Sequence, residues 1–566
     1  MPQPFLAAAP DIADPWLTSQ TTTREVTSRP WTIVFIIVVF FVSLASISFM
    51  VRDRVPFGWD EADYINRAFL DRSAIRLSPK AYIGRLLKDD VSRPPAYRML
   101  HVPFSLAAGV SAPELRLVSF AALLLTLWLV YLAVNEVAGT SASIFAVLFI
   151  LPLPAVLAPV TSFGTEHVLY IAVAGSLWSL VRMFRDAASR QRCLQLGCFI
   201  ALGLLAKVTF VTVAAPLIVV FALARAAGFI ERPRIIDLAA AIAIAILVAL
   251  PWYAVNFKSA LGYAQYASQF VRHSLPYSSP FARTLAFAAL IVESAIGYRL
   301  PALGVVTLCL ALRRHNRSGM ELKSDRTVAL FAMSASVLGT LGIQLVSHNH
   351  NPRFTAPALI LIGAALGILA GASSLVRSRG FLAFSCCLIF FQLGLVLTHW
   401  PYDALFTTSS GFMGQPPSTL FQRERGWDWQ KLRALCRDRF KDNPDLRIGN
   451  LGSSGYFNPP QITHPWFEYS AARPLVPKHT EDTWLWHYEN GPLDWRKLFD
   501  SLDRYDVLLT APDLVGDPTD KEDLDNKHNS EFVRRLEADP RFAPPVVIRP
   551  VEDGPDVYVY FRRSVP

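Results

Sequence analysis

Charged residues are scarce in this chain. Asp, Glu, Lys and Arg make up 17% of its 566 residues, while hydrophobic residues make up 52%. Soluble domains usually carry about 25% charged residues, so a soluble protein throughout its length is excluded. Cysteine is also rare: only Cys436 of the six lies beyond residue 400, and no CxxC pair occurs. Neither a disulfide framework nor a cysteine zinc site is therefore expected.

The hydrophobic residues are concentrated in blocks. A membrane-spanning helix needs about 20 apolar residues. Nine blocks reach or approach that length: residues 31–50, 113–135, 141–160, 163–181, 235–255, 284–312, 328–346, 354–375 and 380–398. A longer block, 193–226, is interrupted by Lys207, and we expect two short helices with Lys207 at the turn. The sequence thus predicts a polytopic α-helical membrane protein with about eleven spans, whose first block is a signal anchor rather than a cleaved signal.

Basic residues orient these spans. Four short loops rich in Arg or Lys would all face the cytoplasm if the N-terminus is cytoplasmic, as the positive-inside rule requires: residues 182–192, 225–234, 313–326 and 376–379. The C-terminus then lies outside. Much of the net charge of +9 is explained by these loops and by attraction to anionic lipid, so it does not indicate nucleic-acid binding.

The polar segments define the remaining organisation. Residues 1–30 read as a disordered cytoplasmic tail, and 51–112 as a large first outer loop with short helices at 60–72 and 80–90. The second of these helices could lie on the membrane surface or belong to a folded loop. Residues 401–566 lack a spanning segment and predict a soluble α/β domain, with strands at 446–451, 505–510 and 556–561 and helices at 428–440 and 528–538. The intervening 31–400 would form the membrane domain.

Two polar motifs fall in the first outer loop. GWDEADY places Asp60 and Glu61 just after the first span. A carboxylate there can accept a proton from a hydroxyl or hold a metal, although acids at a helix start also favour the helix dipole. SRPPAYRML places Arg93 before a proline pair, where it can bind phosphate or simply anchor the chain at the interface.

Three further motifs lie at the outer ends of later spans. Glu166 opens a span in TSFGTEHVLY, Lys207 interrupts LLAKVTF, and Arg353 opens a span in SHNHNPRFTAP. The alternative role of Glu166 is that of a helix-start acid, and the alternative for Lys207 is a lysine that extends to the interface. His348 and His350 are two residues apart, which suits one metal ion only in an extended chain; an ordinary polar loop is the alternative.

These positions share one side of the membrane although they span about 290 residues of sequence. Ionisable groups near hydrocarbon are costly and mark functional sites. Two carboxylate sites and three cations beside lipid suit transfer from a membrane-anchored phosphodiester, because a base can deprotonate the acceptor while cations stabilise the leaving phosphate.

The order of these motifs resembles the GT-C polytopic glycosyltransferases, including protein O-mannosyltransferases and the lipid A aminoarabinose transferase. The resemblance rests on WDEADY, RPPAY, SFGTEHVLYIAV, LGLLAKVTF and NPRFTAPAL, within residues 31–400. The sequence departs from many relatives in having Glu at the second acid and Arg before the proline pair.

The resemblance implies a role for each residue. Asp60 would be the general base, with Glu166 and Glu61 assisting, and the donor phosphate would bind Arg93, Lys207 and Arg353. The donor would be a polyprenyl-phosphate sugar, a hexose or a pentose, transferred with inversion. A divalent cation stays open, since some relatives use one and others do not.

We therefore expect a transferase of a bacterial inner membrane that acts on a glycan, lipid or protein acceptor. The main alternative is a transporter or flippase of a lipid-linked glycan, which should show repeated halves and polar groups near the bilayer midplane. A non-catalytic scaffold is a third reading, and it leaves Asp60, Glu166 and Lys207 unexplained.

Overall fold

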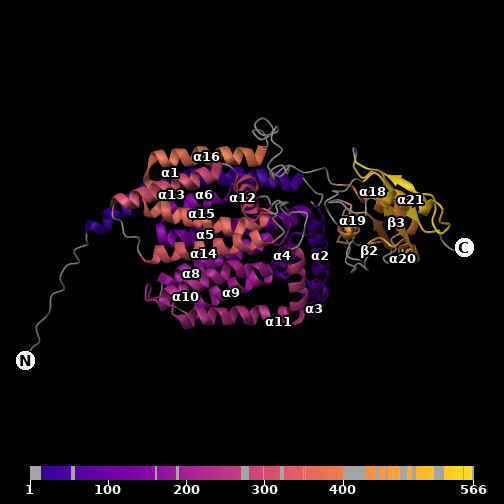
Figure 1. The fold of residues 1–566 in the computed structure, drawn as a ribbon, viewed down its shortest axis with the longest axis horizontal. Coiled ribbons are helices and arrows are strands. Elements are labelled where there is room, and N and C mark those ends of the chain that lie inside the picture. Colours follow the sequence, from indigo (N-terminus) through magenta and orange to yellow (C-terminus); the bar gives the residue numbers. More distant parts are fainter. Residues whose placement is uncertain are drawn as a thin grey trace, which may run out of the picture.

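The computed structural model places a helical bundle beside a small mixed sheet (Figure 1). It describes most of the chain, in the following ranges: residues 15–52, 58–157, 159, 162–185, 190–268, 279–297, 299–318, 324–347, 350, 352–398, 427–441, 446–452, 457–471, 481–486, 492–514, 528–551 and 554–563.

The bundle is built from the predicted apolar blocks. Its helices are α1 (Pro15–Arg52), α5 (Ala112–Ala138), α6 (Thr140–Ile150), α8 (Glu166–Arg185), α9 (Arg190–Ala206), α10 (Val211–Ala226), α11 (Ile235–Ser268), α12 (Pro280–Leu290), α13 (Arg299–Ser318), α14 (Ser324–Val346), α15 (Ala356–Ala372) and α16 (Arg379–Thr398). Within the described ranges, seven helices are long and apolar enough to cross a membrane, and the shorter apolar helices include α6, α12 and much of α16. A multi-pass membrane protein is therefore confirmed, while the count of eleven spans stays a prediction.

Two expectations need correction. The block 284–312 is not one continuous α-helix, because a π-helical turn at Ile291–Ile296 and Gly297, with φ of 79°, separate α12 from α13. The described part of the N-terminal tail is not irregular either, since α1 already begins at Pro15. Hydropathy averages over a window and cannot detect either a local change of helix type or a helix that continues into polar sequence.

The helices differ in how deeply they are buried. Helices α5, α8 and α15 are mostly covered by their neighbours, whereas α1, α10, α11 and α14 are mostly uncovered. The uncovered helices expose large apolar side chains, such as Phe40 on α1 and Leu247 on α11. Because water disfavours such a surface, these outer helices face lipid.

Side-chain contacts divide the interhelix connections into two groups at opposite ends of the bundle. One end joins Trp31 of α1, the start of α14 and the ends of α5, α8, α13 and α15 through four contacts: Trp31 with Val376, Arg326 with Val137, Arg314 with Ser373, and Arg182 with Glu136. Two Arg-rich loops and the loop at 376–379 therefore share the end where the first span begins.

The other end carries the first outer loop. This loop forms α2 (Gly58–Leu77), α3 (Pro79–Lys88) and α4 (Ala96–Ala107), which confirms the two predicted helices. Ser78 caps α3 by accepting a hydrogen bond from Ala81 N, and Leu86 of α3 is buried. Asn256 of α11 donates to Leu87 O at 3.0 Å, so α3 belongs to a folded loop fixed to the bundle. Ile83 on its outward side is 55% exposed.

The C-terminal residues form a five-stranded sheet in the order β2-β1-β3-β5-β4. The strands are β1 (Arg447–Leu451), β2 (Glu481–Trp484), β3 (Val507–Thr510), β4 (Val546–Ile548) and β5 (Val557–Phe561). β1 runs parallel to β2 and β3, and β5 runs antiparallel to β3 and β4, with Leu508 opposite Tyr560. The three predicted strands are confirmed.

Helices cover both faces of this sheet. One face packs Ile448 and Leu509 with residues of α18 (Gln430–Phe440) and α19 (Pro459–Ala471). The other face packs Leu508 with α20 (Trp495–Ser501) and α21 (Asn529–Glu537). Alternate residues of a strand point to opposite faces, so two apolar cores arise from the same strands. The predicted α/β fold of this region is confirmed.

The C-terminal region contacts the bundle through α2. Asn66 Nδ2 donates to Pro460 O at 2.9 Å, and Asn66 Oδ1 lies 2.9 Å from His464 Nδ1. Phe69 lies one turn further along α2, with its ring 6.3 Å from the His464 ring. Figure 1 shows α2 and α3 across one end of the bundle with α19 next to α2.

Candidate functional site

Three of the predicted site residues meet at the outer-loop end of the bundle. Glu166 is the first residue of α8, Lys207 lies in extended backbone between α9 and the turn Val208–Phe210, and Arg353 lies in the turn Pro352–Thr355 before α15. Glu166 Oε1 lies 2.7 Å from Lys207 Nζ and 3.7 Å from Arg353 Nε. The predicted helix break at Lys207 is therefore confirmed, and it directs the lysine toward this carboxylate.

The cluster of Glu166, Lys207 and Arg353 presents positive charge outward. Glu166 is the most buried of the three side chains, at 9% exposure, whereas Lys207 is 21% and Arg353 39% exposed. Both cations also lie over the Phe354 ring, at 4.7 and 5.2 Å from its centroid. These three side chains are two cations and one carboxylate, and both cations lie close to that carboxylate, so cationic groups that can interact with an anion outnumber the acid among them.

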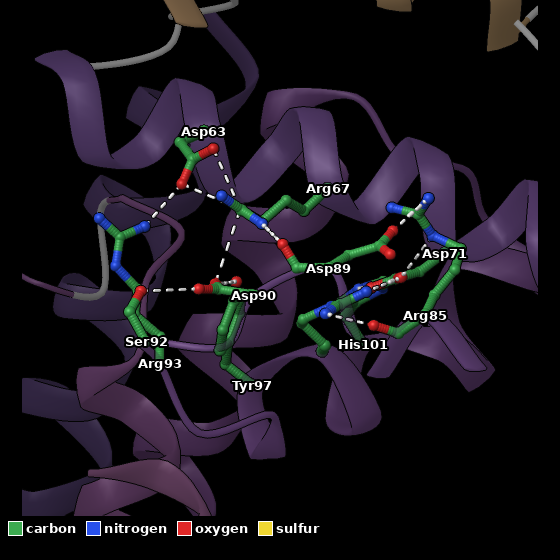
Figure 2. Close-up of polar contacts among 11 residues, drawn as sticks. Asp63, Arg67, Asp71, Arg85, Asp89, Asp90, Ser92, Arg93, Tyr97 and His101 are labelled. Carbon is green, nitrogen blue, oxygen red and sulfur yellow. Dashed lines mark hydrogen bonds and ion pairs between the residues drawn. The ribbon is translucent and has the colours of Figure 1, made fainter. Parts of the chain in front are cut away.

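Arg93 lies in a second group of charges, on the loop between α3 and α4 (Figure 2). Its Nη1 contacts Asp63 Oδ2 at 2.6 Å. The guanidinium also lies 5.2 Å from the Tyr64 ring and 5.5 Å from the Tyr263 ring, which belongs to α11. Arg67 donates to both carboxylate oxygens of Asp63 at 3.0 Å.

Gly164 lies next to both groups of charges, the cluster of Glu166, Lys207 and Arg353 and the group around Arg93. A Cβ atom at this position would lie 2.9 Å from Glu166 Oε2 and 3.7 Å from the Tyr64 ring. The Tyr64 ring, which carries Arg93 near its face, and the Glu166 carboxylate therefore border the same backbone position. A methyl group there would contact the end of the Glu166 side chain, which would have to shift.

Arg67 and Arg93 keep the Asp63 carboxyl group ionised although it is buried. Burial alone would raise the pKa of its carboxyl group, but the charges and hydrogen bonds of Arg67 and Arg93 outweigh that effect and hold the pKa below its ordinary value of 3.8. Asp63 is therefore ionised at neutral pH, and the pair with Arg93 is a true ion pair.

Asp60 lies in the first turn of α2, and its side chain is outside the described residues. The neighbouring Glu61 is 1% exposed and accepts from Arg116 Nε and Nη2 at 2.7 and 2.8 Å. Its Oε1 also accepts from Phe163 N at 2.8 Å. Glu61 therefore ties the first turn of α2 to α5 and to the segment before Glu166, which fixes the backbone that carries Asp60.

A buried group deeper in the loop was not anticipated from the sequence. Arg98 of α4 contacts the Asp71 carboxylate at 2.8 and 2.5 Å, and Arg85 of α3 lies 3.5 Å from it. Figure 2 shows Asp71, Arg85 and His101 together beneath α2. These residues join the three helices of the loop. The pattern of charges in α2 gave no signal for this group, because its partners come from other helices.

Of the two predicted metal candidates, the structure describes only His350. His348 is outside the described residues, and His350 is buried, with its ring 5.4 Å from that of Phe287. In the part of the chain that the structure describes, no three His, Cys, Asp or Glu side chains are arranged to hold a metal ion. No metal ligand set is therefore assigned.

Comparison with known proteins gives one family match and several similar structures. A family model described as dolichyl-phosphate-mannose-protein mannosyltransferase matches residues 92–253, which contain Arg93, Glu166 and Lys207. No curated protein sequence matches the chain.

Several solved structures share the architecture. ArnT from Cupriavidus metallidurans bound to undecaprenyl phosphate has a TM-score of 0.54 at 13% identity, over 94% of this chain and 98% of that chain. The arabinofuranosyltransferase AftD from Mycobacteria has a TM-score of 0.50 at 15% identity, over 93% and 40% of the two chains. The Archaeoglobus fulgidus oligosaccharyltransferase tethered with an acceptor peptide has a TM-score of 0.50 at 13% identity, over 94% and 74%. The GT-C-like fold that the motifs indicated is thus confirmed.

Proposed function

We propose that this membrane protein, which has the fold of these glycosyltransferases, transfers a sugar from a polyprenyl-phosphate donor to an acceptor hydroxyl. The observation that carries the proposal is the convergence of Lys207 and Arg353 on the Glu166 carboxylate at the outer-loop end of a lipid-facing bundle. A phosphate attached to a lipid reaches that depth without leaving the membrane, and the two cations there can hold it.

Each cation has a place in donor binding. Lys207 and Arg353 would bind the phosphate from above Phe354, and Arg93 would reach it from the neighbouring Tyr64 side. Arginine can bind phosphate oxygens in a fork, whereas lysine acts as a compact charge. Glu166 would keep both cations in position and would assist in orienting the acceptor.

The proposed reaction is a single displacement with inversion. Asp60 accepts the proton of the acceptor hydroxyl, and the oxygen attacks the anomeric carbon of the sugar from the face opposite the phosphate. The bond between the anomeric carbon and the phosphate oxygen breaks, and polyprenyl phosphate leaves with the bonding electrons. The three cations stabilise the charge that develops on this phosphate.

The remaining assignments follow from the same reading. Residues 31–400 would form the catalytic membrane domain, and 401–566 would form an extracytoplasmic domain that binds the glycan, lipid or protein acceptor. The protein would lie in a bacterial inner membrane with a cytoplasmic N-terminus. A flippase fits less well, because the three cations proposed to bind the donor, Arg93, Lys207 and Arg353, lie at one end of the bundle, whereas a transporter site lies near the midplane.

An in vitro transfer assay with purified protein and a polyprenyl-phosphate sugar tests the proposal. Asp60→Asn keeps the size of the side chain but removes its basicity. We expect donor binding to persist and turnover to fall about 10²–10⁴-fold, the usual cost of losing a positioned base. Asp438→Asn, at a side chain 73% exposed on α18, is the control and should leave turnover unchanged.

The same preparation tests the phosphate site. Lys207→Ala should weaken donor binding, and Lys207→Arg should partly restore it. Turnover near wild type for Asp60→Asn would remove this residue from the mechanism. A wild-type protein that moves lipid-linked sugar across vesicles without transferring it would favour the flippase.

A further inference from the structure

Asp63 joins two arginines that come from different parts of the first outer loop. It lies on α2 and shares its Oδ2 between Arg93, at 2.6 Å, and Arg67, at 3.0 Å (Figure 2). The Asp63 side chain is only 17% exposed. Asp60 and Asp63 are three residues apart on this helix, so they lie on neighbouring parts of its surface.

The carboxylate is held independently of Arg93. Arg67 binds both of its oxygens from one turn further along α2, and the same arginine donates to Asp89 O at 3.1 Å and lies 3.6 Å from the Asp90 carboxylate. Arg67, which lies on the same helix, therefore fixes the Asp63 carboxylate. The contact between Asp63 and Arg93 in turn fixes the Arg93 guanidinium.

Arg93 needs such support because of where it lies. Residues 91–95 connect α3 to α4 without helical hydrogen bonding of their own. The rings of Tyr64 and Tyr263 flank the guanidinium, at 5.2 and 5.5 Å from its central carbon. An arginine side chain on such a segment has many rotamers, and fixing one of them costs entropy that an ion pair can offset.

We infer that Asp63 is a positioning residue that sets the orientation of the Arg93 guanidinium toward the donor phosphate. This inference rests on the proposed function and adds to it a residue whose role is distinct from that of the base Asp60. Asp63 acts through Arg93 and contacts neither donor nor acceptor. Its carboxylate also offsets one of the two neighbouring positive charges, those of Arg67 and Arg93.

The inference predicts a separation between donor binding and turnover. In Asp63→Asn the positive charge of Arg93 remains, so the donor dissociation constant should change less than about threefold. The orientation of Arg93 is lost, so kcat should fall by roughly 10- to 100-fold, the range expected when a transition-state group is displaced by about 1 Å. Arg93→Ala should instead weaken donor binding, because it removes the charge itself.

Two further variants make the result decisive. Asp63→Glu retains the carboxylate and should recover part of kcat. Asp89→Asn is the matched control, since the Asp89 side chain pairs with Arg85 and its backbone contact to Arg67 is unaffected; its kcat should match wild type. Donor binding by Asp63→Asn also shows that this variant is folded.

The measured kcat and donor affinity distinguish a failure of the positioning role from a failure of the proposed function. If wild type transfers sugar and Asp63→Asn does so at the same kcat, the positioning role is overturned while the proposed function stands. If Asp63→Asn loses donor affinity as fully as Arg93→Ala with no change in kcat, Asp63 only maintains binding charge, and the role is again overturned. If wild type neither binds nor turns over a polyprenyl-phosphate sugar, both proposals fail.

Discussion

Individual buried charges stabilise the first outer loop. Asp71 and Arg98 are fully buried and come from α2 and α4, and Arg85 of α3 lies beside them. Burying charged groups costs several kcal/mol unless they are paired with good geometry, and removing one partner leaves the other charge uncompensated. The loop therefore depends on this group to keep its three helices together.

The Asp71 pair predicts an acid limit for the loop. Burial alone would raise the pKa of Asp71, but contacts from Arg98 and His101 lower it to about 2 from an ordinary value of 3.8. A carboxyl group with a lowered pKa in the folded state stabilises the fold at a pH above its ordinary pKa, and this stabilisation disappears as the pH falls toward the folded value. The shift corresponds to about 2 kcal/mol.

Hydrogen exchange of residues 58–107, corrected for the intrinsic effect of pH, measures this limit. Protection should be constant from pH 8 to pH 5 and should fall progressively between about pH 4 and pH 2. Equal protection at pH 6 and pH 2 would show that Asp71 contributes nothing through its charge. A loss already complete at pH 5 would implicate a different group.

At the scale of single residues, the sequence predicted which charged residues belong to the site better than it predicted which residues they contact. Glu166, Lys207 and Arg353 were identified because each is a charge at the end of an apolar block, and the structure brings them together. Asp63 stands in the same short motif as Asp60, yet its role depends on Arg93, thirty residues away. The Glu61 pair with Arg116 is hidden in the same way, because Arg116 lies inside an apolar helix, α5.

Helix α2 connects the parts of the molecule that the proposed reaction uses. Glu61 attaches its first turn to α5, Asp63 contacts Arg93, and Asn66 contacts α19 of the C-terminal region. A displacement of the C-terminal region would therefore be transmitted to the helix that carries Asp60. The Asn66 contact is the most direct place to test this connection.

Asn66→Ala should loosen the C-terminal region from α2. The change removes the hydrogen bond to Pro460 O and the contact with His464, each worth about 0.5–1.5 kcal/mol. We expect the KM for the acceptor to rise several-fold while donor binding is unchanged. A double-mutant cycle with His464→Ala should give a coupling energy of at least about 0.5 kcal/mol.

Ser501→Ala provides the comparison for this cycle, since the Ser501 hydroxyl bonds only to Leu498 O within α20 among the contacts described. Additive effects of Asn66→Ala and His464→Ala would mean that the two side chains do not act together. An unchanged acceptor KM in all variants would separate the C-terminal region from acceptor binding.

Some elements could not be predicted from the sequence. β2 reads Glu-Asp-Thr-Trp, which is polar and short, and it forms because β1 offers a free parallel edge. β4 has three residues and depends on β5 in the same way. β3 and β5 were predictable because buried strands read as largely apolar runs whatever their partners. Helix α19 was missed because Pro459, Pro460 and Pro465 interrupt its pattern.

The whole molecule divides into two ends, and the orientation in the membrane that we propose depends on that division. The contacts of Trp31, Arg182, Arg314 and Arg326 lie at one end, and the cluster of Glu166, Lys207 and Arg353 lies at the other. The positive-inside rule assigns the first of these ends to the cytoplasm.

Reporter fusions test this orientation. A fusion after Trp400 should report the outside, and a fusion near Arg190 should report the cytoplasm. Alkaline phosphatase, active only outside, and green fluorescent protein, fluorescent inside, give complementary signals. A cytoplasmic signal from the C-terminal region would place Asp60 on the wrong side for the proposed reaction.

The proposed donor site of Glu166, Lys207 and Arg353 lies at one end of the bundle, and this position predicts how the proposed reaction responds to the membrane potential. A charge that crosses the membrane couples to the potential by about 2.3 kcal/mol per 100 mV. The donor phosphate at Lys207 and Arg353 would enter and leave on one side of the field, and the acceptor proton would remain on that side at Asp60. Sugar transfer should therefore proceed at the same rate in energised and de-energised membranes, so a cell could continue it while its membrane potential collapses.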